Sequence, residues 1–107
     1  MEENNVLRGK QKRYLRAHAH AMHPIFSVGK NGLTQAWLDQ LTGALEKREL
    51  IKINLQQSAE ATVDETKEFI EQGTDIQVVQ TIGRVLVLYR PATDEENQKI
   101  SSVVENM

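Results

Sequence analysis

Residues 25–55, IFSVGKNGLTQAWLDQLTGALEKRELIKINL, contain the pattern that decides the fold. Residues 25–28 are short, apolar and partly β-branched, which predicts a buried strand. Apolar side chains then recur at helical spacing, so we expect a helix that is capped by Thr34 and ends near Glu49. Residues 50–55 alternate between apolar and polar side chains, as a half-covered strand does. Strand, helix and strand in this order predict a βαβ unit, whose strands are parallel if they are neighbours.

Two more amphipathic helices are predicted outside this unit. Residues 7–22 place their apolar and neutral side chains within roughly a third of a helical wheel. This helix should stop near His23, because a proline follows and disfavours helical backbone in the residue before it. A third helix should begin at Ser58 or Thr62 and end at Gly73, taken as a left-handed C-terminal stop. Its outward-facing side chains are mostly carboxylates.

Two β-prone segments, residues 76–82 and 85–89, are separated only by Gly83 and Arg84, which favours a tight antiparallel hairpin. The sequence therefore predicts an α/β fold. We expect a small two-layer domain with the order helix, strand, helix, strand, helix, strand, strand and a four-stranded mixed sheet.

The chain changes in composition after this hairpin. We expect the domain to span residues 1–91. Residues 92–107 are polar and acidic and offer at best one short apolar helical stripe. The prediction for them is a frayed acidic tail, since chain ends with few apolar contacts are the usual sites of disorder.

Charge is distributed unevenly along the chain. The formal net charge is −2, but residues 1–52 have nine Lys and Arg against five Asp and Glu. Residues 53–107 have four against ten. Binding of an anion depends on the local field over one face of a protein, so the overall charge does not exclude an anionic partner.

Several classes of protein are not supported by the sequence. The chain has no cysteine, which excludes disulfides and thiolate chemistry. Its first residues, Glu2, Glu3, Asn4 and Asn5, are unlike a secretion signal, and no segment approaches the roughly 18 apolar residues of a membrane span. We therefore expect a soluble cytoplasmic protein.

Catalysis and metal binding also lack support. The chain has no nucleophile elbow, P-loop or dinucleotide fingerprint, so we expect neither an enzyme nor a cofactor. His18 and His20 are two positions apart, about 200° on a helical wheel, and face nearly opposite ways. Together with His23 they are therefore not expected to form a metal site, which needs convergent ligands.

The loop Gly29-Lys30-Asn31-Gly32 joins the first predicted strand to the second helix, and residues 4–38 around it have six basic side chains and no acidic one. Glycines tolerate positive φ and close approach, and the first amides of a helix are unsatisfied donors. With the lysine ammonium nearby, these groups suit a phosphate. An ordinary strand-to-helix turn has the same pattern, so both interpretations stay open on the residues alone.

The first predicted helix is strongly basic. Five cations without any carboxylate repel one another, and an anionic partner would relieve that repulsion. A solvated helix face is the alternative. Arg84 and Arg90 could likewise extend a positive surface or could simply be exposed strand ends. The basic residues of the helix are Arg8, Lys10, Lys12, Arg13 and Arg16.

Four blocks of residues occur in order and with natural spacing between about Leu7 and Pro91. They are His23-Pro24, residues 28–34, residues 49–53 and residues 82–91. Together they resemble the YhbY family, small bacterial proteins made of one CRM domain, the chloroplast RNA splicing and ribosome maturation module.

This resemblance implies an RNA-binding domain similar in fold to the C-terminal domain of translation initiation factor three, with a KH-like GxxG loop. It also implies association with ribosomal RNA in precursors of the large ribosomal subunit. In a KH domain the loop clamps the sugar-phosphate backbone and confers affinity rather than sequence choice. The residues expected to contact RNA are Gly29, Lys30, Asn31, Gly32, Arg8, Lys12, Arg13, Arg16 and Arg84.

The alternative is a protein-interaction adaptor. In that case the basic face would meet an acidic protein partner, and the glycine loop would be only a turn. The RNA segment, the sequence specificity and the oligomeric state stay open at this point.

Overall fold

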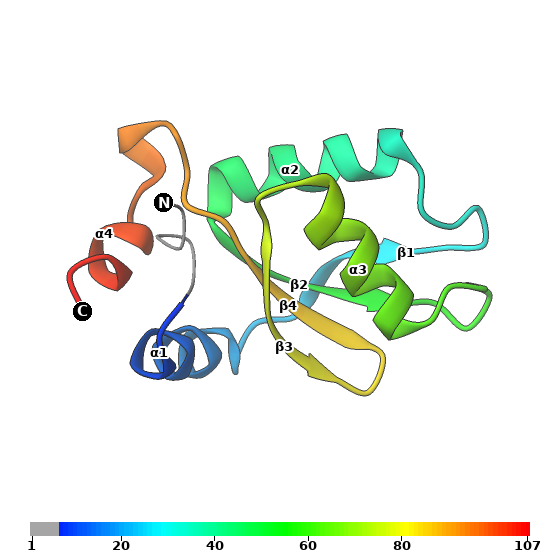
Figure 1. The fold of residues 1–107 in the computed structure, drawn as a ribbon, viewed down its shortest axis with the longest axis horizontal. Helices are drawn as coiled ribbons and strands as arrows, with labels where there is room; N and C mark the ends of the chain where they lie inside the picture. Colours follow the sequence, from blue (N-terminus) through cyan, green and yellow to red (C-terminus); the bar gives the residue numbers. More distant parts are fainter. Residues whose placement is uncertain (1–6) are drawn as a thin grey trace.

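The computed structural model describes residues 7–107, and its sheet has helices on both faces (Figure 1). Glu2, Glu3, Asn4 and Asn5, which argued against a secretion signal, lie outside the described residues. Within residues 7–107, no helix has the length and apolar character needed to cross a membrane. In chain order the elements are α1 (Gly9–Ala19), β1 (Pro24–Val28), α2 (Gln35–Arg48), β2 (Leu50–Leu55), α3 (Val63–Gly73), β3 (Gln77–Ile82), β4 (Val85–Tyr89), the 3₁₀ turn η2 (Glu95–Asn97) and α4 (Ser101–Val104).

The four strands form one mixed sheet in the order β1-β2-β4-β3. β1 and β2 are parallel neighbours joined by α2, which confirms the predicted βαβ unit. β4 runs antiparallel to both β2 and β3, so the hairpin is also confirmed. Gly83 in its turn has a φ of 59°, a conformation that glycine adopts without strain. The predicted element order and the four-stranded sheet are correct.

Alternating strand positions build two cores, one on each face of the sheet, because successive side chains of a strand point to opposite faces. Ile51 and Ile53 pack on one face with α2 and α3. Leu50, Val87 and Tyr89 pack on the other face with α1 and α4. The expected two-layer arrangement is therefore incomplete. It describes the sheet with α2 and α3, while α1 and α4 form a third layer over part of the opposite face.

The strand β1 lies at the edge of the sheet, which corrects the expectation of a buried strand. Ile25 is 48% exposed, and only Val28 at the end of the strand is fully buried. The central strand β2 is more deeply buried than its alternating pattern predicts. Leu50 and Ile51 face opposite cores, and both are at most 1% exposed.

Threonine side chains begin both α2 and α3. The hydroxyl of Thr34 accepts a hydrogen bond from the Trp37 amide at 3.1 Å, as predicted for an N-cap. At α3 the hydroxyl of Thr62 accepts from the Glu65 amide at 3.0 Å, and the Glu65 carboxylate accepts from the Thr62 amide at 2.9 Å. This reciprocal capping box selects Thr62 over Ser58 as the start of the helix.

Gly73 ends α3 for a different reason from the expected one. Among the described residues only Gly32 and Gly83 are glycines with positive φ, so Gly73 is not a left-handed stop. A Cβ atom on Gly73 would lie 2.8 Å from the Leu38 Cδ2 atom, well inside van der Waals contact. Glycine therefore lets α3 approach α2 closely.

Residues 92–104 pack against the rest of the structure, so the expectation of a frayed tail is wrong. Ala92, Ser101 and Val104 are at most 3% exposed. Val104 joins Leu15 and Tyr89 in the core beneath α1. The polar composition of this segment concealed the few apolar side chains that anchor it.

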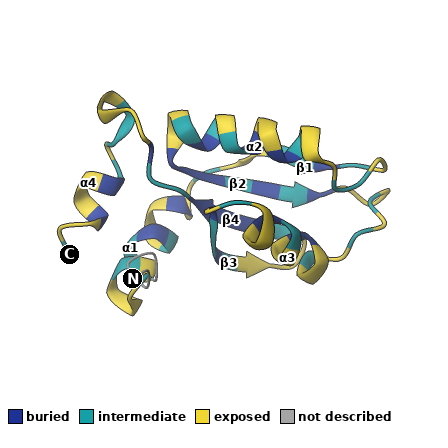
Figure 2. Cartoon of the chain, turned by 45° about the horizontal axis from the view of Figure 1, so that its top comes forward, coloured by how far each residue is buried: buried dark blue, intermediate teal, exposed yellow. Residues whose placement is uncertain are grey.

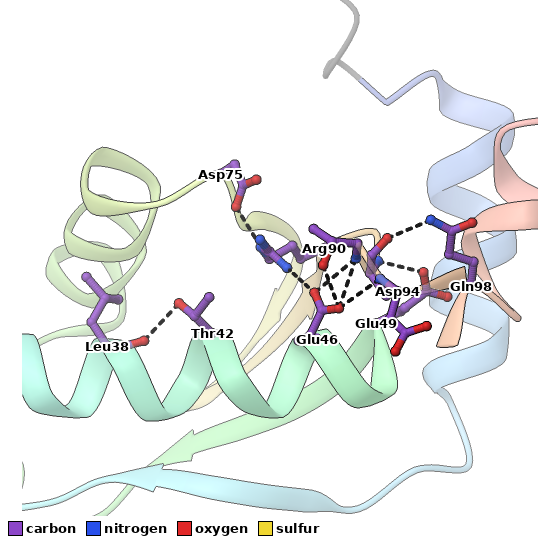
Figure 3. A network of polar contacts seen from close by, with 10 residues as sticks. Leu38, Thr42, Glu46, Glu49, Asp75, Arg90, Asp94 and Gln98 are labelled. Carbon is purple, nitrogen blue, oxygen red and sulfur yellow. Dashed lines mark hydrogen bonds and ion pairs between the residues drawn. The ribbon is translucent and has the colours of Figure 1, made fainter. Parts of the chain in front are cut away.

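The carboxylate of Glu46, near the end of α2, binds the start of this segment (Figure 3). The Thr93 and Asp94 amides each donate to it at 3.0 Å, and the Thr93 hydroxyl donates at 2.8 Å. Arg90 adds an ion pair at 3.0 Å. These donors, above all the Thr93 amide and hydroxyl, lower the pKa of Glu46 to about 2.

The buried Glu49 follows as the C-cap of α2, with a φ of 66° that is uncommon for a residue with a side chain. Its carboxylate accepts hydrogen bonds from the amides of Ala92 and Ile100 at 2.8 Å and from Ser101 at 2.9 Å. Burial raises the pKa of Glu49, but these hydrogen bonds outweigh burial and lower the pKa overall. The two carboxylates thus fasten the C-terminal segment to α2.

Candidate nucleic-acid interface

The GKNG loop, residues 29–32, forms a tight turn with its polar tip in solvent. The Gly32 amide donates to the Gly29 carbonyl at 3.1 Å, and Gly32 has a φ of 76°, which favours glycine. A Cβ atom on Gly29 would lie 3.3 Å from the Gln56 side-chain oxygen. Lys30 and Asn31 between the glycines are both exposed. The two glycines therefore shape the turn, and the two middle residues are free to meet a ligand.

The loop leads directly into the first turn of α2. Thr34 satisfies the Trp37 amide, whereas the Gln35 and Ala36 amides donate to no other atom of residues 7–107. A hollow of about 350 Å³ opens beside them and is lined by the loop, Thr34, Ala36, Trp37 and Gln40. Unsatisfied amides at a helix start, next to a lysine, provide the donors and the positive potential that an anion needs.

Trp37 helps to hold the loop in place. Its indole nitrogen donates to the Ser27 carbonyl at 2.9 Å, and its ring lies 5.8 Å from that of Phe26. Ser27 precedes the loop by two positions, so this bond ties the end of β1 to α2. The side chain is half-buried and is packed against the core between α2 and the sheet.

Arg84 lies at the same end of the sheet as the loop, but its guanidinium is engaged by the protein. It donates to the Leu55 carbonyl at 3.2 Å and to the Gln56 carbonyl at 2.6 Å. Gln56 in turn donates its amide to the Val28 carbonyl at 3.0 Å, just before the loop. Arg84 therefore joins the β3–β4 hairpin to the end of β2 and helps to position the loop region.

The basic helix α1 lies far from this loop. The molecule is 40 Å long, and Figure 1 places α1 toward one end of the long axis and the β1–α2 loop at the other. α1 also covers the sheet face opposite to α2. The predicted contact residues therefore do not form one continuous surface. The structure places the GKNG loop with Arg84 at one end and the cations of α1 at the other.

The cations of α1 also differ from one another in their surroundings. Arg8 donates a short hydrogen bond to the carbonyl of Met107 at the end of the chain. Lys12 lines a hollow with Glu71 and Asp75, so the acidic region of α3 does not lie wholly away from the basic helix. Lys10, Arg13 and Arg16 make no ion pair with any other described residue. Among the cations of α1, these three are therefore the most available to an anionic partner.

Arg90 does not contribute to a positive surface. Its guanidinium pairs with Glu46 at 3.0 Å and with Asp75 at 2.8 Å. The structure thus resolves its two interpretations in favour of an internal ion pair near the C-terminal segment.

The sequence interpretation missed three residues on the sheet itself. Lys52, Gln80 and Ile82 line a hollow of about 280 Å³ together with Arg16, Ala17 and His20 of α1 and the turn that follows it. The polar positions in residues 50–55 were the available signal, because alternation puts Lys52 and Asn54 on one face. That signal could not reveal that α1 leaves this part of the face uncovered.

Within residues 7–107, no three His, Asp or Glu side chains gather in a way that could hold a metal ion. His18 instead lies beside Tyr14, with 5.9 Å between the ring centroids. The expectation that the three histidines bind no metal stays a prediction.

Comparisons with known proteins agree on one family. The model of the CRS1/YhbY (CRM) domain matches residues 7–90. The chain is 44% identical over 95 residues to the Bacillus subtilis protein named "Probable RNA-binding protein YqeI", covering 89% of this chain and 97% of that one. It is 38% identical over 93 residues to a Haemophilus influenzae protein named "RNA-binding protein", covering 87% and 94%. The solution structure of the hypothetical protein SAV1595 from Staphylococcus aureus aligns with a TM-score of 0.65 and 41% identity, over 84% of this chain and 94% of that one.

Proposed function

Because the chain belongs to the CRS1/YhbY (CRM) domain family, we propose that it is an RNA-binding protein whose GKNG loop holds the sugar-phosphate backbone. Two relatives that match this chain over most of their own length are named as RNA-binding or probable RNA-binding proteins. We propose no catalytic activity, since binding and positioning of RNA accounts for the features of the loop.

The observation that carries the proposal is the open corner where the loop meets α2. The Gln35 and Ala36 amides have no acceptor among residues 7–107, and Lys30 is exposed beside them. A phosphate oxygen docked here would accept hydrogen bonds from the amides and would lie near the ammonium group. These contacts involve the sugar-phosphate backbone of RNA and not the base edges, so they supply affinity rather than sequence specificity.

The cations of α1 supply a second and more diffuse contribution. Lys10, Arg13 and Arg16 can attract the phosphates of a strand that extends beyond the loop. Each phosphate contact on single-stranded RNA should add about −0.7 to the slope of log affinity against log salt. We therefore expect a steep salt dependence. A flat titration between low and physiological salt would contradict electrostatic docking.

The decisive variant replaces Lys30 and Asn31 together with aspartate. We expect a loss of RNA affinity of at least about tenfold, because carboxylates would repel phosphate where an ammonium attracted it. Lys67→Asp combined with Gln72→Asp makes the same charge change at two exposed positions of α3 and serves as the control. Thermal unfolding of both variants reports whether the fold is kept.

This experiment also distinguishes RNA binding from a protein-interaction adaptor. A folded loop variant that keeps full RNA affinity would favour the adaptor, in which the basic face meets an acidic protein. Loss of affinity in the loop variant alone, at unchanged melting temperature, supports the clamp.

We further propose that the RNA is ribosomal and that the protein acts in the cytoplasm during assembly of the large ribosomal subunit. The support is the resemblance to the YhbY family. Crosslinking in cell extract, followed by sequencing of the attached RNA and sedimentation of immature subunits, tests this assignment. Recovery of messenger RNA alone, with no co-sedimentation, would overturn it.

A further inference from the structure

One face of the sheet is only partly covered, and we propose that its uncovered part binds the bases of the RNA strand whose backbone lies in the GKNG loop. This inference rests on the proposed function and adds the base-contacting surface that the loop itself lacks. We call the surface the open strip and define it by Arg16, His20, Lys52, Asn54, Gln80 and Ile82.

The strand register shows how the open strip is built. Three rows of residues cross β2, β4 and β3 on this face. The row of Leu50 and Tyr89 is buried under α1. The next row contains Lys52 and Gln80, which are half-buried, and the third contains Ile82. Exposure therefore rises along the strands with distance from α1, and Figure 2 shows the end of β3 as exposed.

The open strip runs from the basic helix toward the loop. At the end near α1, Lys52 and Gln80 line the hollow together with Arg16. At the other end, β2 finishes at Leu55. The next residue, Gln56, bonds to Val28 and lies against Gly29 of the loop. At about 3.3 Å per residue, the six-residue strand β2 spans roughly 20 Å. A single extended RNA strand can therefore cross the sheet from the cations of α1 to the GKNG loop.

The charges along the hollow favour an anionic strand. Arg16 and Lys52 contribute two cations, and no Asp or Glu among the described residues lines this hollow. The neighbouring hollow at Lys12 differs, because Glu71 and Asp75 line it and would repel phosphate. A second copy of the chain is a poorer occupant, since symmetric pairing through this face would bring like charges together.

The remaining side chains suit bases rather than phosphates. Ile82 is 51% exposed and offers an aliphatic surface on which a base can pack. The side-chain carboxamide of Gln80 makes no hydrogen bond with another described residue and can both donate to and accept from a base edge. In a duplex those edges are paired, so the open strip should prefer single-stranded RNA. No Phe, Tyr or Trp among the residues described lines the hollow, and His20 is its one aromatic ring, which predicts modest rather than strong base selectivity.

The test compares two probes of the same charge: a single-stranded RNA of about 12 nucleotides, within the usual site sizes, and an abasic ribose-phosphate oligomer of equal length. Affinities are measured by fluorescence anisotropy at one fixed salt concentration. Gln80→Ala combined with Ile82→Ala removes the base contacts without changing charge. We expect it to weaken binding of the RNA roughly three- to tenfold and to leave binding of the abasic oligomer unchanged.

The loop variant provides the comparison that separates the two proposals. Lys30→Asp with Asn31→Asp should weaken both probes. If the sheet variant binds both probes as the wild type does while the loop variant binds neither, the open strip is not a base site and the RNA clamp stands. If the loop variant keeps its affinity for RNA, the clamp fails. If the sheet variant instead converts a dimer to a monomer in sedimentation equilibrium, the face is a self-association surface and the inference is overturned.

Discussion

The two ends of α2 make opposite use of backbone amides. At its C-terminal end, Glu46 and Glu49 accept hydrogen bonds from the amides of five residues in the C-terminal segment, Ala92, Thr93, Asp94, Ile100 and Ser101. The protein thus supplies its own anions there. At its N-terminal end, the Gln35 and Ala36 amides have no acceptor within residues 7–107.

This difference separates a structural use of polar groups from the functional use that we propose for the loop. A buried polar group left without a partner costs folding free energy, so the carboxylates of Glu46 and Glu49 at the packed end of α2 accept hydrogen bonds from within the protein. The exposed end can leave donors to water at little cost and exchange that water for phosphate. The comparison predicts that changes at the C-terminal end lower stability, whereas changes at the N-terminal end lower RNA affinity.

The largest expected effect is the loss of the Glu49 carboxylate. Glu49→Ala would leave three amide groups without their acceptor, in a part of the structure where Ala92 and Ser101 are almost fully buried. We expect a loss of about 3 kcal/mol in the free energy of unfolding, since each unsatisfied buried group costs about 1–3 kcal/mol. Urea unfolding measures this change. Unchanged stability would mean that the C-terminal segment is not fastened by this carboxylate.

The second effect concerns affinity and leaves stability intact. Lys30→Gln removes one charge from the loop without adding a repulsive one. We expect RNA binding to weaken about fivefold and the salt slope to shrink by about 0.7, as for the loss of one phosphate contact. Anisotropy titrations at several salt concentrations measure both quantities. Lys67→Gln, at an exposed position of α3 where Glu71 and Asp75 line the same hollow, is the matched control and should bind as the wild type does.

A smaller effect is expected at the N-cap of α2, where one substitution should lower both the stability and the RNA affinity. Thr34→Ala removes the hydroxyl that accepts from the Trp37 amide at 3.1 Å. Loss of an N-cap costs about 1 kcal/mol, and the loosened first turn should also weaken RNA binding. Thr34→Ser keeps the hydroxyl and should restore both properties. A Thr34→Ala variant that is destabilised but binds RNA normally would show that the first turn of α2 does not hold the phosphate.

The smallest effect is a loss of stability in acid. Glu46 and Glu49 have lower pKa values in the folded state than the usual 4.5 of an unfolded glutamate, and the pKa of Glu46 falls to about 2. The contribution of Glu46 to stability is therefore complete above pH 4.5 and is lost as the pH falls toward 2, and the contribution of Glu49 is lost in the same direction below pH 4.5. Thermal melts across this range should show a smaller decrease for Glu46→Gln than for the wild type. Equal decreases would exclude Glu46 as a source of the pH dependence.

Much of the fold followed from local patterns. The βαβ unit, the hairpin at Gly83 and the Thr34 cap were all predictable, because periodicity, capping and turn residues act over a few neighbouring positions. The packed C-terminal segment was not. Its anchors are three scattered buried residues, and its polar partners Glu46 and Glu49 lie more than forty positions earlier in the chain.

The candidate site divides in the same way. The loop, its two glycines, the cap of the next helix and the cations of α1 were predictable, since each depends on local residue type and spacing. Packing of distant segments placed α1 and the loop at opposite ends of the molecule and engaged Arg84 and Arg90 within the protein. It also left Lys52, Gln80 and Ile82 on one uncovered face. The physical reason is that a surface forms where distant segments pack or fail to pack, and residue spacing along the chain does not record which sheet face a helix covers or how far along that face it reaches.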